Sequence, residues 1–77
     1  MKKYHESIDV APDRGQPARF RWRGRIYHVR QILDFWVYRG RWWSTEEKRA
    51  YLRVGTDGGV FEIYRLNGHW LLSRVLD

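Results

Sequence analysis

Residues 18–31, ARFRWRGRIYHVRQ, place arginines at alternating positions, and that spacing suits contacts with a chain of phosphates. Alternate side chains of a β-strand lie on one face, about 6–7 Å apart. A guanidinium is permanently charged and donates paired hydrogen bonds to phosphate oxygens. Such a row holds a polyanion without reading its bases. The arginines that we expect on this face are Arg19, Arg21, Arg23 and Arg30.

Two adjacent tryptophans lie beside further arginines in a segment that we predict to be a connection between strands. An exposed ring there would stack on a nucleobase, which contributes about 1–3 kcal/mol per base. The alternative is that the rings plug the open end of a small barrel. We expect one ring to be such a plug, and the sequence leaves the other open. The candidate site therefore extends at its edge to Arg39, Arg41, Trp42 and Trp43.

No grouping of side chains in the sequence is typical of catalysis or of a metal site. The three histidines, His5, His28 and His69, are far apart, and none has a second ligand at metal-binding spacing. No serine lies in a nucleophile elbow. The glycine-rich residues 55–60 lack the lysine and the following helix of a phosphate-binding loop. We expect a protein that is not an enzyme and that needs no metal or cofactor.

The net charge of +6 comes from one contiguous third of the chain. Residues 14–41 contain eight arginines and a single acid, Asp34, whereas the remainder has seven basic and eight acidic residues. A concentrated basic patch attracts phosphate backbones or acidic protein surfaces. The alternative is an arginine-rich composition spread over a solvated face.

The arginines need a hairpin to position them, and Arg23-Gly24 is its predicted two-residue turn. Trp22 then pairs with Arg25, and Phe20 pairs with Tyr27. This register predicts one apolar face and one basic face, as in a half-buried sheet. The apolar face consists of Phe20, Trp22, Tyr27 and Val29. The opposite face consists of Arg19, Arg21, Arg23, Ile26, His28 and Arg30.

The rest of the chain predicts more short strands and one domain over residues 1–77. Residues 4–10 alternate as a strand, residues 11–17 contain two prolines and a glycine and predict a loop, and Ser44 begins a capping box that allows one helical turn. The apolar residues 31–38 predict a bulged or bent strand buried on both faces. The final third predicts a meander of strands 50–56, 60–66 and 69–77, with turns at Asp57–Gly59 and Asn67-Gly68.

These elements predict an all-β fold: a small antiparallel barrel or roll of SH3-like or OB-like size, with five to six strands and at most one short helical turn. A chain of 77 residues without cysteine must draw its stability from packing, and its five Trp, five Tyr and three Phe provide the buried area. The side chains that we expect in the core are Phe20, Trp22, Tyr27, Val29, Trp36, Ile63, Tyr64 and Trp70.

The cellular location of the protein is predicted from the absence of membrane-spanning and signal-peptide patterns and of cysteine. No apolar stretch approaches 18 residues, and the first ten residues have no apolar run of a signal peptide. The absence of cysteine fits a reducing compartment. We expect a soluble cytoplasmic protein that does not enter a membrane.

The motifs FRWRGRIYHV, RWW, FEIYR and WLLSRVLD resemble a small bacterial domain family over residues 18–77. The pattern of that family is similar to the C-terminal module of the polymerase-like mutasome subunits, relatives of the Y-family polymerases that act in damage-tolerant DNA synthesis. The resemblance implies an accessory module linked to DNA repair. It also implies no catalysis, because the polymerase portion has no counterpart here.

Two functions remain open after these observations. The first is a module that binds nucleic acid non-specifically through the arginine-rich hairpin face. The second is a protein-interaction module that docks a replication or repair protein through an exposed strand edge or through the loop of Trp42 and Trp43. The concentrated charge and the resemblance favour the first.

Overall fold

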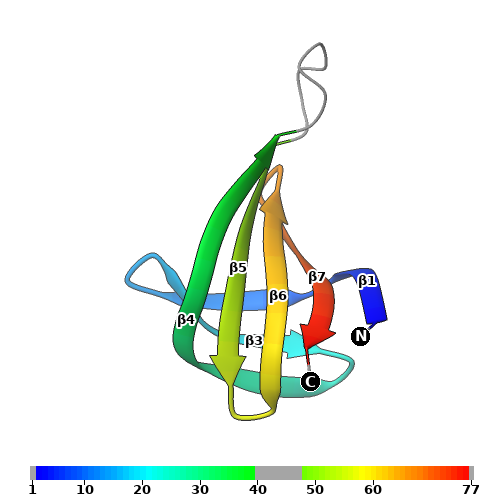
Figure 1. Cartoon of the computed structure of the whole chain (residues 1–77). Helices are drawn as coiled ribbons and strands as arrows, with labels where there is room; N and C mark the ends of the chain where they lie inside the picture. Colours follow the sequence, from blue (N-terminus) through cyan, green and yellow to red (C-terminus); the bar gives the residue numbers. More distant parts are fainter. Residues whose placement is uncertain (1, 40–47, 77) are drawn as a thin grey trace.

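A computed structural model describes residues 2–39 and 48–76, which form seven β-strands (Figure 1). The order of the strands in the sheet is β1-β7-β6-β5-β4-β3-β2, and neighbouring strands are antiparallel. The predicted all-β class is thereby confirmed. None of the described residues lies in a helix long and apolar enough to cross a membrane. The strands are β1 (Lys2–Ser7), β2 (Asp9–Asp13), β3 (Gln16–Trp22), β4 (Arg25–Arg39), β5 (Lys48–Thr56), β6 (Gly59–Leu66) and β7 (His69–Leu76).

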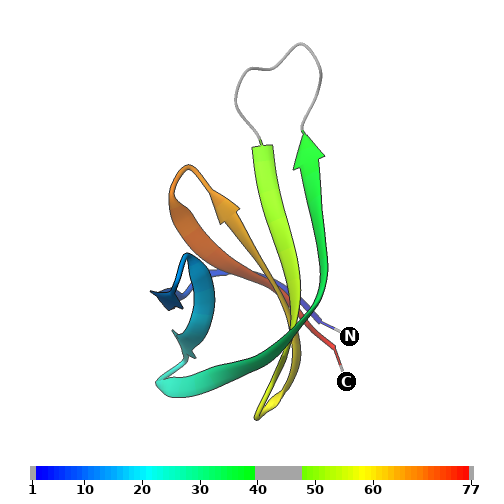
Figure 2. The same ribbon diagram turned by 90° about the vertical axis from the view of Figure 1, so that its left-hand side faces the viewer.

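The sheet curls into a half-barrel, and the N-terminal segment lies along both of its edges (Figure 1, Figure 2). β1 pairs with β7 at one edge and β2 pairs with β3 at the other, yet only Ile8 separates β1 from β2. The backbone N–H of Ile8 donates to the carbonyl oxygen of Trp70 at 3.1 Å. One continuous segment therefore covers backbone groups at both edges of the sheet.

The strand count is seven rather than five to six, because residues 11–17 are not the predicted loop. They end β2 and begin β3, and the two strands meet at a tight turn of Arg14 and Gly15. Pro12 and Pro17 lie opposite each other in this hairpin, and the register shifts just before Pro12. Proline lacks a backbone N–H, so it is tolerated in an edge strand or at a bulge. The prolines mark an irregular hairpin instead of a loop.

The predicted turns at Arg23-Gly24 and Asn67-Gly68 are confirmed, and both have positive φ at the two central residues. The φ values are 52° and 77° in the first turn and 51° and 80° in the second. This geometry is that of a type I′ turn, whose twist matches that of paired strands. The predicted register of the first hairpin also holds, since Trp22 pairs with Arg25 and Phe20 with Tyr27.

The turn between β5 and β6 consists of Asp57 and Gly58, while Gly59 already pairs with Thr56. A Cβ on Gly58 would lie 2.6 Å from Cε2 of Tyr27, closer than any real Cβ contact. Only glycine therefore lets this turn pack on the ring of Tyr27. The hydroxyl of Thr56 closes the turn by accepting from the Gly58 N–H at 3.0 Å and donating to the Gly59 carbonyl at 2.8 Å.

The core fills the inner face of the half-barrel. Phe20, Tyr27 and Ile63 are buried in it as predicted, and Trp22, Val29 and Trp70 are half-buried against it. The ring of Phe20 stacks on Tyr27 with centroids 5.3 Å apart and meets Phe61 edge-on at 5.4 Å. The whole buried cluster is Ile8, Phe20, Tyr27, Val54, Phe61, Ile63 and Leu72.

Trp36 and Tyr64 lie outside this core, on the outer face of the half-barrel. Trp36 pairs with Tyr51 and Tyr51 with Tyr64, whereas their chain neighbours belong to the inner face. Successive side chains of a strand point to opposite faces, so these rings point away from the core. Tyr64 is buried there and Trp36 is half-buried. Tyr64 is therefore buried as predicted, although on the outer face. Trp36 is only half-buried and lies outside the buried cluster, so the prediction that it belongs to the core is wrong.

Residues 31–38 form a bent strand as predicted, but they are not buried on both faces. The β4–β5 register shifts twice, between Val29 and Gln31 and between Ile32 and Asp34. Each shift is a bulge that bends the strand and increases its twist. β4 pairs with β3 only through Arg25–His28, and its second half continues beyond that hairpin with β5 beside it (Figure 2). None of the described strands covers most of its apolar side chains, and these stay exposed.

Candidate nucleic-acid interface

The β3–β4 hairpin places Arg19 and Arg21 side by side on the outer face of the half-barrel. Arg19 pairs with His28 and Arg21 with Ile26, and all four side chains are exposed. Their chain neighbour Phe20 points into the core, so the alternation predicted from the sequence is confirmed at these positions. The side chains of Arg19 and Arg21 leave the backbone of the strand about 6–7 Å apart.

Strand β2 borders this pair of arginines on the other side. Ala11 pairs with Arg19, and Asp9 pairs with Arg21. An open surface hollow of about 270 Å³ lies at this point. Among the described residues, no ion pair joins Asp9 to Arg21. The hollow is lined by Asp9, Val10, Ala11, Arg19, Phe20, Arg21 and Ile26.

Arg30 extends the basic strip along β4. It lies two residues after His28 and at the first bulge of the strand, where it is exposed. The β5–β6 turn holds the backbone of His28 in place: Asp57 Oδ1 accepts from the His28 N–H at 3.1 Å, and the Asp57 N–H donates to the His28 carbonyl at 3.3 Å. The turn thereby fixes the part of β4 that carries both side chains.

Arg23 does not belong to this strip, contrary to the prediction. Its guanidinium forms a bidentate ion pair with Glu6 of β1, with distances of 3.2 Å to Oε1 and 2.7 Å to Oε2. It also lies 4.8 Å from the ring of Trp22 and 5.1 Å from that of Tyr4. Arg23 is a turn residue with positive φ, and its guanidinium lies over two rings that pack against the core. Arg23 connects the hairpin to β1.

The hydrogen bonds from Arg23 and from the indole N–H of Trp22 lower the pKa of the Glu6 carboxyl below its usual value. A depressed folded pKa adds stability that is fully present above the unfolded pKa and is lost as the pH falls through the folded value. We therefore expect Glu6→Gln to be less stable than the wild type at neutral pH and to lose less stability on acidification. Thermal unfolding of both proteins, monitored by circular dichroism at pH values from neutral down to below about 4, measures this difference in stability.

Asp13→Asn is the control for this titration, because Asp13 is an exposed carboxylate in no ion pair of the described residues. It should keep the acid slope of the wild type. Equal acid slopes for Glu6→Gln and the wild type would show that the contact with Arg23 does not contribute to the pH dependence.

The remaining predicted residues fall at the far end of β4 or beyond it. Arg39 is the last residue of β4, pairs with Lys48 and is exposed. Arg41, Trp42 and Trp43 lie outside the described residues, as does the capping box at Ser44. The basic strip therefore consists of Arg19, Arg21 and His28 on one face, and Arg30 follows them at the first bulge of β4.

The arginines of the described residues differ in whether they have a partner within the protein. Within residues 2–39 and 48–76, no ion pair or stacking contact involves Arg19, Arg21, Arg30 or Arg39. Other arginines have intramolecular partners: Arg23 with Glu6, Arg53 and Arg74 with Glu62, Arg25 over the ring of Tyr27, and Arg49 over the ring of Tyr64. The charges of Arg19, Arg21, Arg30 and Arg39 are available to an external anion.

A second arginine–aromatic group on the outer face was missed in the sequence. Trp36 stacks on Tyr51 with centroids 5.3 Å apart, and Tyr51 lies 5.0 Å from Tyr64. Nδ1 of His5 lies 3.0 Å from the hydroxyl oxygen of Tyr64, and Arg53 lies 5.6 Å from the ring of Trp36. The sequence did contain a signal for this group. Counting pairs away from the Asp57–Gly58 turn, beginning with Thr56 and Gly59, places Tyr51 opposite Tyr64. The rings contact one another and protein arginines, and Tyr64 is buried.

The described residues contain no group of three or more His, Asp or Glu side chains that could hold a metal ion. The geometry of the outer face instead supports electrostatic contact through exposed guanidinium groups. In comparisons with known proteins, no curated protein and no solved structure matches the chain. One family model, described as "Domain of unknown function (DUF6504)", matches residues 1–77. Because this match covers every residue, the chain belongs to the DUF6504 domain family.

Proposed function

We propose that the protein is a non-catalytic accessory module that binds nucleic acid through Arg19, Arg21 and Arg30. The observation that carries this proposal is that Arg19 and Arg21 are exposed on one face, that Arg30 is exposed at the bulge just beyond them, and that none of the three has an ion-pair partner among the described residues. Guanidinium groups at strand spacing match the repeat of a phosphate backbone. Arg39 and the neighbouring Arg41, Trp42 and Trp43 would extend the contact at the end of β4.

DNA is the polymer that we propose, in DNA repair or damage tolerance, on the strength of the similarity of residues 18–77 to the mutasome module. A cytoplasmic location follows from this proposal, and the absence of cysteine is compatible with it. Contacts to phosphates position a protein without selecting a sequence. Binding would therefore be non-specific, of weak to moderate affinity and strongly dependent on salt.

The double variant Arg19→Glu/Arg21→Glu is expected to bind DNA about tenfold or more weakly than the wild type at about 50 mM salt. Each lost phosphate contact also removes about one unit from the slope of log K against log salt, so the slope should fall by about two. Fluorescence anisotropy with single- and double-stranded DNA and RNA, at about 50 and about 200 mM salt, measures both quantities.

The matched control is Lys3→Glu/Arg65→Glu, which changes the net charge equally at two exposed positions away from the strip. It should reduce the affinity much less than the double variant in β3. Equal losses in the two variants would show that only the overall charge matters. Absence of binding by the wild type at the lower salt would refute the proposal.

A further inference from the structure

The second half of β4 has a long free edge. Within the described part of the chain, β4 pairs with β3 only as far as His28, and from Val29 to Arg39 it pairs with β5 alone. At about 3.3 Å per residue, the free edge is about 30–36 Å long. The backbone N–H and C=O groups that such an edge leaves unpaired are a template for another strand. Asp34 Oδ1 already accepts one of the N–H groups here, that of Phe35. Natural proteins usually shorten or cover edges of this length, so its exposure calls for an explanation.

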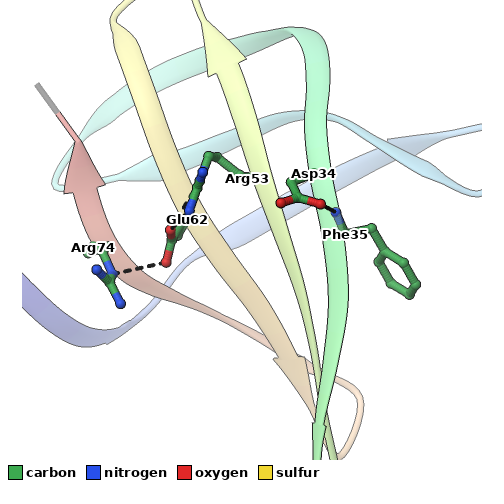
Figure 3. A network of polar contacts seen from close by, with 5 residues as sticks. All are labelled: Asp34, Phe35, Arg53, Glu62 and Arg74. Carbon is green, nitrogen blue, oxygen red and sulfur yellow. Dashed lines mark hydrogen bonds and ion pairs between the residues drawn. The ribbon is translucent and has the colours of Figure 1, made fainter.

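Exposed apolar side chains accompany this edge. Phe35 is 59% exposed, and Val37 is 42% exposed on the same face. Figure 3 shows the ring of Phe35 pointing away from β5, on the side of β4 that has no neighbouring strand. Five of the six large apolar side chains that are exposed among the described residues belong to this half-strand: Ile32, Leu33, Phe35, Val37 and Tyr38.

The charges along the edge favour an acidic partner. Arg30 and Arg39 lie near its two ends, are exposed and have no ion pair among the described residues. The acid between them, Asp34, has an oxygen that accepts the backbone N–H of Phe35 at 2.8 Å (Figure 3). The two guanidinium groups are therefore left as unpaired charges that flank an apolar stretch.

A second copy of the chain fits this edge poorly. If the free edge paired antiparallel with itself over its whole length, Asp34 would lie directly opposite Asp34 of the other copy. In the same register, Arg30 would lie one residue from the position opposite Arg39. Like charges directly opposite in a sheet are destabilising. Both copies would also carry a net charge of +6.

We propose that the free edge of β4, from Val29 to Arg39, binds an extended segment of a partner protein by adding it as a strand. The segment has apolar side chains at alternate positions, which pack on Phe35 and Val37, and a carboxylate near each end, which pairs with Arg30 or Arg39. Backbone hydrogen bonds supply affinity in this mode, and side-chain contacts at alternate positions supply specificity. This surface shares Arg30 and Arg39 with the proposed DNA contact, but it does not include Arg19 and Arg21.

Selection of displayed random peptides of about eleven residues against the full chain tests this proposal. Enriched peptides should alternate apolar residues and carry Asp or Glu near both ends. Binding of a synthetic enriched peptide should slow amide hydrogen exchange within residues 29–39. Phe35→Lys, which places a charge on the docking face at an exposed position, should weaken that peptide at least tenfold. Val37→Lys places a charge at the next exposed position of the same face and should weaken the peptide in the same way.

When the selection is repeated with Arg30→Glu/Arg39→Glu, the enriched peptides should carry Lys or Arg near their ends instead of Asp or Glu. Arg19→Glu/Arg21→Glu should leave peptide binding unchanged, and Phe35→Lys should leave DNA binding unweakened, so the peptide and DNA proposals can fail separately. The inference is overturned if no peptide is enriched, or if enriched peptides bind Phe35→Lys and Val37→Lys as tightly as the wild type. It is also overturned if the wild type sediments as a dimer that Phe35→Lys converts to a monomer.

Discussion

Replacing Phe20 with alanine is expected to lower the free energy of unfolding by about 3–5 kcal/mol. The ring is 1% exposed and packs between Tyr27 and Phe61, so its loss leaves a cavity at the centre of the core. The total stability of a domain of this size is about 4–12 kcal/mol, at about 0.05–0.15 kcal/mol per residue. The variant should therefore be largely or wholly unfolded in mild denaturant, as measured by urea titration with far-UV circular dichroism.

Phe35→Ala is the matched control, because the same ring is removed from an exposed position of the same sheet. Its free energy of unfolding should change by about 0.5 kcal/mol or less, as is usual for surface substitutions. Similar losses in Phe20→Ala and Phe35→Ala would contradict the placement of the core on the inner face of the half-barrel.

Replacing Glu62 with alanine is expected to lower the free energy of unfolding by about 3 kcal/mol. The Glu62 residue is 1% exposed on the outer face, and its Oε2 accepts from Nε and Nη2 of Arg53 at 3.1 and 2.8 Å. Its Oε1 lies 3.0 Å from Nε of Arg74 (Figure 3). The carboxylate thus connects β5 and β7 through β6. Without it, two guanidinium groups face each other across a small apolar side chain.

The expected loss is at the lower end of the range for a broken buried ion pair, because both arginines keep access to water. Their side chains are 41% and 34% exposed. Arg65→Ala is the control, since Arg65 is an exposed arginine of the same strand without an ion pair in the described part of the chain. A double-mutant cycle between Arg53 and Glu62 measures the coupling directly. A coupling energy near zero would mean that the cluster does not stabilise the fold.

The local pattern of the sequence determined the β3–β4 hairpin. Arg23-Gly24 favours a two-residue turn, the turn sets the register, and the register places Phe20 and Arg21 on opposite faces. In the same way, the turns at Asp57-Gly58 and Asn67-Gly68 set the registers of the β5–β6 and β6–β7 pairs in the C-terminal meander. These features depend on residues close together in the chain, so the sequence alone was sufficient for them.

The sequence was insufficient where two bulges or a distant strand decide the outcome. Trp36 was assigned to the core because residues 31–38 are almost all apolar, but a bulge after Ile32 and the partner strand β5 set which face each side chain occupies. The exposure of Phe35 depends on where β3 stops pairing with β4. Apolar content cannot distinguish a buried strand from one with a free edge.

The candidate site shows the same division between local and tertiary information. Alternation along β3 was enough to place Arg19 and Arg21 on the outer face, because the period of a strand is two residues. Arg23 has the same spacing, but its charge is paired with Glu6, a residue 17 positions earlier in the chain. Glu62 was indistinguishable from a surface acid until Arg53 and Arg74 were placed on either side of it. Residue type and period determine which side chains can bear charge on a face, whereas only the tertiary structure decides which of those charges are paired within the protein.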